Sequence, residues 1–377
     1  MSVSPFLALP GAVEQPDALD HGVPSHYGSP NIEQRLIERG EAIVDLSNRG
    51  IVTVTGPDRL SWLHSITSQD LRSLSVGGST ETLFLDQSGR IEHAVKVLDD
   101  GTTTWLLTEA DDASPLHAWL DRMRFMLRVE VAIVTEEYAL IGAAGGLGID
   151  AAEPNGVPLV WHDPWAAVAV GGHQYATSEH PAAAWSWTES VVERSRLAEL
   201  ADAVQSGTFA AAGSIAADAL RIAAWRPRLG SEVDERSIPH ELDWLRSAVH
   251  LTKGCYRGQE TVAKVHNLGH PPRRLVMLLL DGSDSVLPPA GSPVVLVQGV
   301  GDDAVRKPVG TVTSSAIHHE LGPVALAVVK RSADAAAVMV VEAEGVDVAA
   351  SQEVIVPADA GATANVPRLP RLGAVRR

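Results

Sequence analysis

Hydrophobic and polar residues alternate over several short runs of this chain, a pattern that predicts strands with one buried face. The clearest case lies between residues 81 and 108, where ETLFL, IEHAVKVL and TTWLLT are separated by the polar turns DQSGR and DDGT. This order predicts an antiparallel meander. Apolar residues spaced three to four apart instead predict helices, here over residues 57–66, 114–125, 190–204 and 208–225.

The pattern changes at Pro271 and Pro272. Beyond them the chain reads as short strand-like runs separated by turns: RLVMLLL, SPVVLVQ, PVGTVTSSA, VALAVVK, AAVMVVEA and SQEVIVPA. Strands at such regular spacing predict a small antiparallel barrel or sandwich. Before the two prolines, helices and strands mix without strict βαβ alternation, so the fold class is α+β rather than a doubly wound sheet.

The length of 377 residues suits more than one domain. We expect an irregular leader over residues 1–35, which is rich in Pro, Gly, Asp and Ser, and a mixed α/β region over residues 36–270. The barrel is expected over residues 271–357, and residues 358–377 read as a loose tail.

Composition excludes several classes of protein. A formal net charge of -17 is unlike a general nucleic-acid binder, which is usually basic. No run approaches the roughly 18 apolar residues that a membrane span needs. The N-terminus lacks a basic region followed by a long apolar run, so we expect no signal peptide. One cysteine allows neither an internal disulfide nor a cysteine-based metal site, so we predict no metal and a cytoplasmic location.

The single cysteine lies in the segment KGCYRGQE, residues 253–260. The surrounding stretch, residues 250–274, inverts the charge of the chain: its only acid is Glu260, and its basic residues are Lys253, Arg257, Lys264, Arg273 and Arg274. Gly254 and Gly258 allow a close backbone approach or a turn with positive φ. A helix is expected to begin at GQETVAKV, and its free N–H groups favour an anion or a polar ligand edge.

Two interpretations of Cys255 stay open. Lys253, Arg257 and the start of the helix would stabilise a thiolate, which favours a reactive cysteine. A buried, inert cysteine is as common. A cysteine nucleophile also needs a base, and the histidines nearest in sequence are His250, His266 and His270.

The same segment carries groups that suit a pterin with an acidic tail. Gln259 and Glu260 present planar acceptors of the kind that pair with an aminopyrimidine edge. Lys253 and the neighbouring arginines suit a carboxylate.

Here the chain resembles a known family. KGCYRGQE is similar to the K-G-C-[YF]-x-G-Q-E signature of the YgfZ proteins, which are folate-binding relatives of the glycine-cleavage T-protein (aminomethyltransferase). Weaker similarities occur in the same order along residues 40–355: VTGPDRLSWLHSITSQDL, LFLDQSGRIEHAVKVL, RIAAWRPRLGSEVDERSIPHEL, PVGTVTSSA and VALAVVK. The resemblance leaves both ends of the chain unmatched.

The resemblance implies a fold of two interleaved α/β lobes and a C-terminal β-barrel around a central channel that holds tetrahydrofolate. The second lobe is expected over roughly residues 131–205. The motif lysine and cysteine face the channel in this family, so Lys253 and Cys255 are the candidate catalytic residues. The candidate cofactor-binding residues are Lys253, Gly254, Tyr256, Arg257, Gly258, Gln259 and Glu260.

The chain departs from the T-protein at two positions. The T-protein's catalytic aspartate lies in a G-[GR]-I-L-D-D hairpin, where this chain has GRIEHAV, with His93 and Ala94. The glutamate that holds the pterin, in R-x-E-A-G, is replaced by Ala223. His93 is a candidate substitute base, although a strand histidine without a catalytic role is the more common case.

Three functions follow from these observations. The first is a tetrahydrofolate-binding accessory protein that supports iron–sulfur cluster assembly or repair. Cys255 would then act in a one-carbon, redox or persulfide step, and the partners would be a reduced folate and iron–sulfur enzymes or assembly proteins. The second is a folate-dependent aminomethyltransferase or demethylase, by analogy of fold. The third is a non-catalytic interaction module on the same fold.

Overall fold

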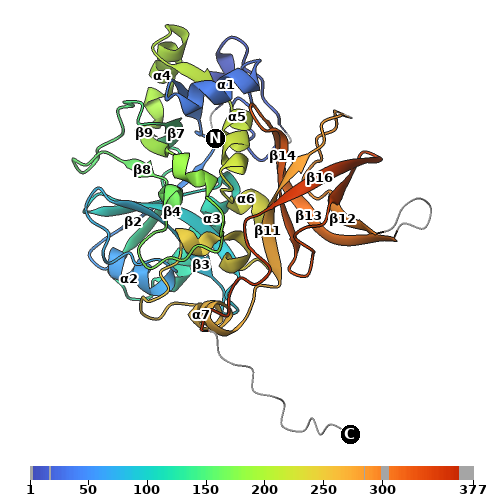
Figure 1. Cartoon of the computed structure of the whole chain (residues 1–377). Coiled ribbons are helices and arrows are strands. Elements are labelled where there is room, and N and C mark those ends of the chain that lie inside the picture. Colours follow the sequence, from blue (N-terminus) through green and yellow to red (C-terminus); the bar gives the residue numbers. More distant parts are fainter. Residues whose placement is uncertain (1–2, 17, 284, 299–304, 365–377) are drawn as a thin grey trace, which may run out of the picture.

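The structure is a computed structural model that describes residues 3–16, 18–283, 285–298 and 305–364. The described residues form two five-stranded sheets and a closed six-stranded barrel. Figure 1 shows the barrel on one side of both sheets, with helices α5 (Ser214–Ala223) and α6 (Leu229–Glu232) between them. This architecture confirms the predicted α+β class with a C-terminal barrel.

The first sheet has the strand order β3-β4-β5-β2-β6 and is antiparallel throughout. Helices α2 (Arg59–Ile66) and α3 (Ala113–Met123) cover one of its faces through a cluster that includes Leu63, Phe84 and Leu120. The predicted meander is confirmed. The strands are β2 (Gly50–Thr55), β3 (Ser79–Leu85), β4 (Ile91–Asp99), β5 (Thr103–Thr108) and β6 (Glu130–Ile133).

The second sheet has the order β10-β1-β7-β9-β8, and its first pair, β10 with β1, is parallel. It joins segments from both sides of the first sheet in the sequence, so the two lobes are interleaved as expected. Its strands are β1 (Ala42–Asp45), β7 (Tyr138–Ala144), β8 (Val160–His162), β9 (Trp187–Glu193) and β10 (Ala210–Ala212), and its helices are α1 (Pro30–Glu38), α4 (Leu197–Gln205) and α5.

Two helix predictions need correction in this sheet. Residues 190–193 belong to β9, and the helix begins only at Leu197, because Thr188, Val191 and Val192 are β-branched residues that pair with β7. Residues 210–212 form β10, and helix α5 follows at Ser214. The alanines of β10 gain the backbone bonds of a parallel strand, which outweigh their helix propensity.

The barrel closes in the order β11-β14-β13-β12-β15-β16 around an apolar interior. Glu232 of α6 connects the lobes to the barrel. Its side chain is fully buried and accepts hydrogen bonds from Thr313 (3.0 Å) and Ser314 (2.5 Å) of β13. The strands are β11 (Arg273–Leu280), β12 (Pro293–Gln298), β13 (Val305–His318), β14 (Gly322–Lys330), β15 (Met339–Ala343) and β16 (Val346–Val354).

The ends of the chain carry more structure than their composition indicates. Phe6 is fully buried, and helix α1 starts at Pro30, inside the segment for which we expected no regular structure. Residues 358–364 of the predicted tail return along α7 (Gln259–Leu268), where the backbone N–H of Thr363 donates to the carbonyl of His266. Residues 365–377 lie outside the described part. Within the described residues, no helix combines the length and the apolar character that crossing a membrane requires.

Candidate functional site in the central cavity

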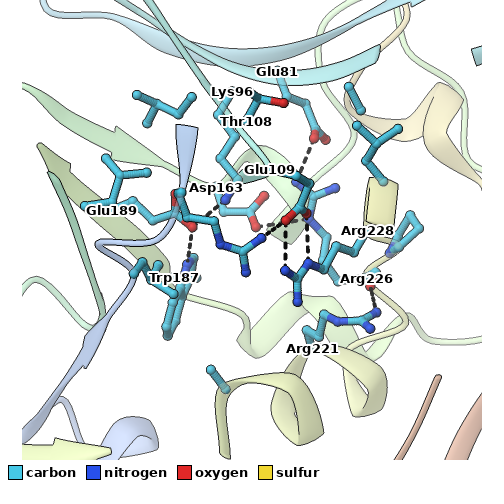
Figure 2. Close-up of a pocket in the computed structure, with 18 of the residues that line it drawn as sticks. Glu81, Lys96, Thr108, Glu109, Asp163, Trp187, Glu189, Arg221, Arg226 and Arg228 are labelled. Carbon is cyan, nitrogen blue, oxygen red and sulfur yellow. Dashed lines mark hydrogen bonds and ion pairs between the residues drawn. The ribbon is translucent and has the colours of Figure 1, made fainter. Parts of the chain in front are cut away.

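A cavity of about 120 Å³ lies between the two sheets and helix α5, and Figure 2 shows the charged residues around it. β3, β4 and β5 form one wall, β7 and β9 form another, and residues 226–229 complete it. Acids and bases are nearly balanced, so the cavity is lined by ion pairs. Its acids are Asp20, Glu81, Glu109, Asp163, Glu189 and Asp218, and its bases are Arg49, Lys96, Arg221, Arg226 and Arg228.

Arg226 joins two carboxylates at one end of the cavity. Its guanidinium donates to Glu81 Oε2 (2.6 Å) and Asp163 Oδ2 (3.1 Å) and lies over the Trp165 ring. Burial alone would lower the pKa of Arg226, but Asp163 and Glu81 outweigh it and raise that pKa. The indole N–H of Trp244 also donates to Glu81 Oε2, at 3.3 Å. Glu81 is therefore fixed from two sides.

Two tryptophans of the second lobe form an aromatic wall. The rings of Trp185 and Trp187 stack with their centroids 5.8 Å apart and an angle of 20° between them. The Trp187 N–H donates to Glu189 Oε1 (3.0 Å), to which the Lys96 ammonium also donates. Burial would raise the pKa of Glu189, but Lys96 outweighs it and lowers that pKa. Glu189 is therefore an anion at neutral pH.

A square of two arginines and two carboxylates occupies another side. Arg228 donates to Glu109 through Nε and Nη2, both at 2.8 Å, and to both oxygens of Asp20 at 2.7 and 2.8 Å. Arg49 bonds the same two acids, with Nη2 2.9 Å from Asp20 Oδ1. Burial and the charge of Arg228 lower the pKa of Arg49 to about 10. Both guanidinium groups remain charged at neutral pH.

Four charged side chains of the cavity keep a buried polar atom without a hydrogen-bond partner among the described residues. They are Glu81 Oε1, Glu189 Oε2, Arg226 Nη1 and Arg49 Nε. Each of these groups has a charged partner through its other atoms, but a buried polar atom left without a hydrogen bond is costly and calls for an explanation. Two acceptors and two donors inside one cavity fit a polar ligand that carries both kinds of group.

The candidate Lys253 lies elsewhere. Its ammonium donates to the backbone carbonyls of His64, Thr67 and Gln69 at 2.5, 2.6 and 2.8 Å. The first of these belongs to the last turn of α2, where carbonyls lack partners within the helix. Burial lowers the pKa of Lys253 to about 7, while three acceptors favour its charged form. Lys253 acts here as a buried clamp between the motif and α2.

The other motif residues form a turn and the start of α7. None of residues 253–260 is among those that line the cavity. Gly258 has φ +83 and packs on the β3–β4 turn, Gln259 donates to the carbonyl of Lys253, and Arg257 pairs with Glu92. Tyr256 is buried under Lys253, whereas Gly254 and Glu260 are exposed. Their predicted contacts with a ligand stay predictions.

Cys255 is exposed on the surface of this turn. The three histidines near it in sequence bond to other groups in the described part of the chain: His250 to Thr252, His266 to Tyr175 and His270 to the carbonyl of Ala360. The structure thus brings none of them into a hydrogen bond with the thiol. Exposure rules out the interpretation of Cys255 as a buried, inert residue.

The two hairpin residues that differ from the T-protein motif, His93 and Ala94, have side chains on opposite sides of β4. Ala94 lines the cavity, whereas His93 packs on the other side of β4, with Nδ1 2.6 Å from Asp112 Oδ1 and its ring against Phe84. His93 is therefore a poor candidate for a base in the cavity. Ala223, at the other position, is not among the residues that line it.

A second group of possible ligand atoms comes from Glu38, His318 and His319, which lie within 4.8 Å of one another. The backbone N–H groups of Glu320 and Leu321 donate to His318 Nδ1, so this ring carries its proton on Nε2. A neutral imidazole in that state has no free lone pair for a metal. With Glu38 2.7 Å from His319 Nε2, the group serves as a polar contact between α1 and the β13–β14 hairpin.

Two family models match the chain, the GCVT N-terminal domain over residues 17–150 and the glycine cleavage T-protein C-terminal barrel domain over residues 273–356. The first match begins inside the expected leader. The glycine cleavage system aminomethyltransferase T of Bartonella henselae has the same fold, with a TM-score of 0.69 at 17% identity over 92% of this chain and 94% of that one. The chain therefore belongs to the family of the glycine cleavage T-protein, as its resemblance predicted.

The relatives of this chain include both aminomethyltransferases and a YgfZ protein. The aminomethyltransferase of Streptomyces avermitilis is 26% identical over 81% of this chain and 83% of its own length. The tRNA-modifying protein YgfZ of Photorhabdus laumondii is 25% identical over 66% of this chain and 73% of its own. A chloroplastic protein of Arabidopsis thaliana is 25% identical, and this chain spans 61% of its length.

Apart from Ala94, the residues of the cavity could not be singled out from the sequence. Ala94 and Lys96 lie on the polar face of β4, which alternation assigns to solvent, but the second sheet covers that face. The ion pairs lie beside an apolar cluster that joins the two sheets and includes Leu98, Trp105 and Leu140, and a charged residue at such a place reads locally as a surface residue. The segment RPRLG, which contains Arg226 and Arg228, is the one local clue, since two arginines flank a proline beside a buried helix.

Proposed function

We propose that this chain binds a reduced folate, tetrahydrofolate or a derivative, in the central cavity and serves in the cytoplasm as an accessory protein of iron–sulfur cluster assembly or repair. The observation that carries the proposal is the set of four unpartnered charged atoms beside a stacked tryptophan pair. Such a site suits a flat heteroaromatic ligand with donors and acceptors along one edge, as a pterin has.

The fit can be assigned group by group. The free oxygens of Glu81 and Glu189 would accept hydrogen bonds from the amino group and ring N–H of the pterin, and Arg226 Nη1 would donate to its carbonyl. Trp185 and Trp187 offer apolar surface to the ring. Glu81 and Glu189 would thus supply the carboxylate that Ala223 lacks.

Bound tetrahydrofolate supplies nitrogen atoms that carry one-carbon units, and the residues of this chain bind and orient it. Lys96 keeps Glu189 ionised, so this carboxylate accepts hydrogen bonds and has no proton to give at neutral pH. Arg226 donates to Glu81 Oε2 and holds this carboxylate in place as an acceptor. Both favour ligand binding over acid catalysis.

An aminomethyltransferase is the alternative function, and the Streptomyces relative supports it as directly. One observation counts against it: of the two hairpin positions aligned with the D-D of the T-protein motif, the one that lines the cavity carries only the methyl group of Ala94. The test is incubation with an aminomethyl donor and tetrahydrofolate. Formation of methylenetetrahydrofolate would establish the alternative.

Calorimetric titration with 5-formyltetrahydrofolate tests the binding site. Glu81→Gln and Glu189→Gln each remove a charged acceptor and should weaken binding about 10-fold or more, since a hydrogen bond to a charged group contributes about 1.5–3 kcal/mol. Glu92→Gln, outside the cavity, is the matched control and should bind like the wild type. If the wild type does not bind 5-formyltetrahydrofolate, the proposed folate site is wrong and only the fold is shared with the folate-binding relatives.

The accessory role needs a cellular test. Cells that lack the gene should lose activity of iron–sulfur enzymes, and the wild-type chain should restore it. Glu189→Gln should fail to restore it if folate binding is required. Full restoration by a variant that no longer binds folate would separate the two parts of the proposal.

A further inference from the structure

The N-terminal segment forms a loop whose two ends lie side by side, at Val13 and at residues 25–26. The backbone N–H of Val13 donates to the carbonyl of His26 (2.9 Å), and that of Ser25 donates to the carbonyl of Val13 (2.7 Å). Loops of 6–16 residues with such paired ends are Ω-loops, which are often functional.

Asp20 is the one buried side chain among the described residues of this loop between 14 and 22. Its side chain contacts the cavity arginines: it accepts both Nη groups of Arg228, at 2.7 and 2.8 Å, and lies 2.9 Å from Arg49 Nη2. The loop, whose returning residues 23–25 are also buried, thus places a single carboxylate into a buried site for two guanidinium groups.

The two carboxylates of the arginine square differ in how they are held. Glu109 follows β5 directly, and Figure 2 shows it bonded to Arg228. Its release would disturb the first sheet. Asp20 is held by the base of the loop, by the contact of Leu19 with Gly230, and by Asn48, whose Nδ2 donates to Asp20 Oδ1 (3.5 Å) and to the carbonyl of His21 (3.2 Å). Asp20 can therefore leave the arginines without unfolding a sheet.

Asp20 also separates two spaces. An outer pocket of about 430 Å³ lies between the loop, α5 and the barrel, with Leu287 and Ala316 in its wall. The inner cavity and this pocket share Asp20, Ser214, Asp218 and Arg228. The Asp20–Arg228 ion pair is thus part of the wall between them, and its displacement would bring them together.

We propose that Arg49 and Arg228 form a binding site for the carboxylate of a ligand, and that Asp20 occupies this site until the ligand replaces it. The exchange conserves charge, because one carboxylate leaves as another arrives, and a planar guanidinium binds either in the same bidentate way. The ligand class is a small molecule with a carboxylate tail that extends from the inner cavity to the outer pocket. Identifying it as a reduced folate rests on the function proposed above.

The test compares the wild type with Asp20→Asn in calorimetric titrations. The probes are 5-formyltetrahydrofolate, p-aminobenzoylglutamate and glutarate, which all carry carboxylates, and tetrahydropterin, which has none. Asp20→Asn removes the competing charge and should bind the three carboxylate probes about 10-fold more tightly, with tetrahydropterin unchanged. Asp218→Asn, which borders the same two spaces but pairs with Arg221, is the matched control and should bind like the wild type.

Other outcomes separate this inference from the folate proposal. Equal affinity of wild type and Asp20→Asn for 5-formyltetrahydrofolate overturns the exchange and leaves folate binding intact. If Asp20→Asn binds glutarate more tightly than the wild type but neither protein binds 5-formyltetrahydrofolate, the exchange is supported and the proposal of folate as the ligand is wrong. Failure of Asp20→Asn to bind any carboxylate probe overturns the site.

Hydrogen exchange on the wild-type chain tests the same inference without a variant. Saturating 5-formyltetrahydrofolate, or glutarate if that alone binds, should accelerate exchange of the Val13 and Ser25 amides several-fold as the loop leaves Arg228. Unchanged or increased protection of both amides with the probe bound would show that Asp20 stays in place and would overturn the proposal.

Discussion

Gly258 of the motif and Gly89 of the β3–β4 turn meet backbone to backbone. A β-carbon on Gly258 would lie 3.0 Å from the Gly89 Cα and 2.6 Å from the carbonyl oxygen of Asp86. Gly258 also has φ +83, which other residues adopt at a cost. The glycine-rich motif is thus fitted to the hairpin of the first lobe.

Substitution at this contact should destabilise the fold. Gly258→Ala is expected to lower the free energy of unfolding by about 2–4 kcal/mol, because both the dihedral angle and the close approach resist a methyl group. Urea unfolding measures the change. Gly254→Ala is the matched control, since nothing lies within 4 Å of its β-carbon and its φ is not positive. A larger loss for Gly254→Ala than for Gly258→Ala would contradict this account.

Lys253→Met should destabilise the chain by about 2–3 kcal/mol. It retains most of the side-chain volume but leaves three carbonyl acceptors without their donor. Thermal unfolding measures the effect. Ligand affinity, determined on the folded variant, shows whether Lys253 also contacts the ligand as the family resemblance implies. A variant with wild-type stability would mean that water replaces the ammonium without cost.

Glu232→Gln should loosen the barrel from the lobes. The carboxylate accepts from Thr313, Ser314 and Arg221, and removing its charge breaks a buried pair, which costs about 3–5 kcal/mol. All nine tryptophans precede residue 245, so their fluorescence reports the lobes, whereas circular dichroism reports both parts. The two unfolding curves should separate in the variant. Coincident curves would contradict the expectation, and Glu235→Gln, at an exposed position, is the control.

Acid should destabilise the chain through His240. This ring is fully buried, with Nε2 3.0 Å from the carbonyl of Val262, and burial together with the charges of His266 and His173 lowers its pKa from 6.5 to about 4. Between pH 6.5 and 4 the unfolded chain binds a proton that the folded chain does not, so stability falls as the pH falls.

The loss attributable to His240 is about 3 kcal/mol, at roughly 1.4 kcal/mol per pKa unit. Burial also raises the pKa of Asp243 to about 7, which acts in the opposite direction over the same range, so the wild-type curve reports a sum. The difference between two urea-unfolding curves isolates His240: the stability of His240→Gln relative to the wild type should increase by about 3 kcal/mol as the pH falls from 7 to 4. Parallel curves would mean that His240 is not the group responsible.

Cys255 should react in the native state. Because its thiol is exposed, Ellman's reagent should label one thiol per chain without prior unfolding. Cys255→Ser should fold with wild-type stability, which makes it a clean variant for functional assays. Wild-type activity of Cys255→Ser in the cellular test would remove any chemical role for the thiol and favour the non-catalytic interaction module.

The strands of the barrel and of the first sheet could be predicted because short apolar and β-branched runs are separated by polar turns, although some of them, such as β5 and β11, are buried on both faces. β9 was missed because no Gly or Pro separates it from the helix that follows at Leu197, so the strand and the helix read as one segment. The motif was found because glycines, a cysteine and basic residues lie together in sequence. The cavity was not, because Glu81, Glu189 and Arg228 come from distant segments and each reads locally as a surface charge. Asp20 lay in a leader whose composition indicates no structure, yet the leader packs on the lobes.

The parallel pairing of β1 with β10 has a consequence for synthesis of the chain on the ribosome. The strands of the first sheet and of the barrel each lie in one continuous segment of the sequence. Ala42 of β1, by contrast, can pair with Ala210 of β10 only after more than 160 further residues have been synthesised. At about 5–20 residues per second, this edge of the second sheet stays open for roughly 10–30 s after β1 has been made. During that time the nascent chain exposes an unpaired strand, which is where a chaperone would be expected to bind.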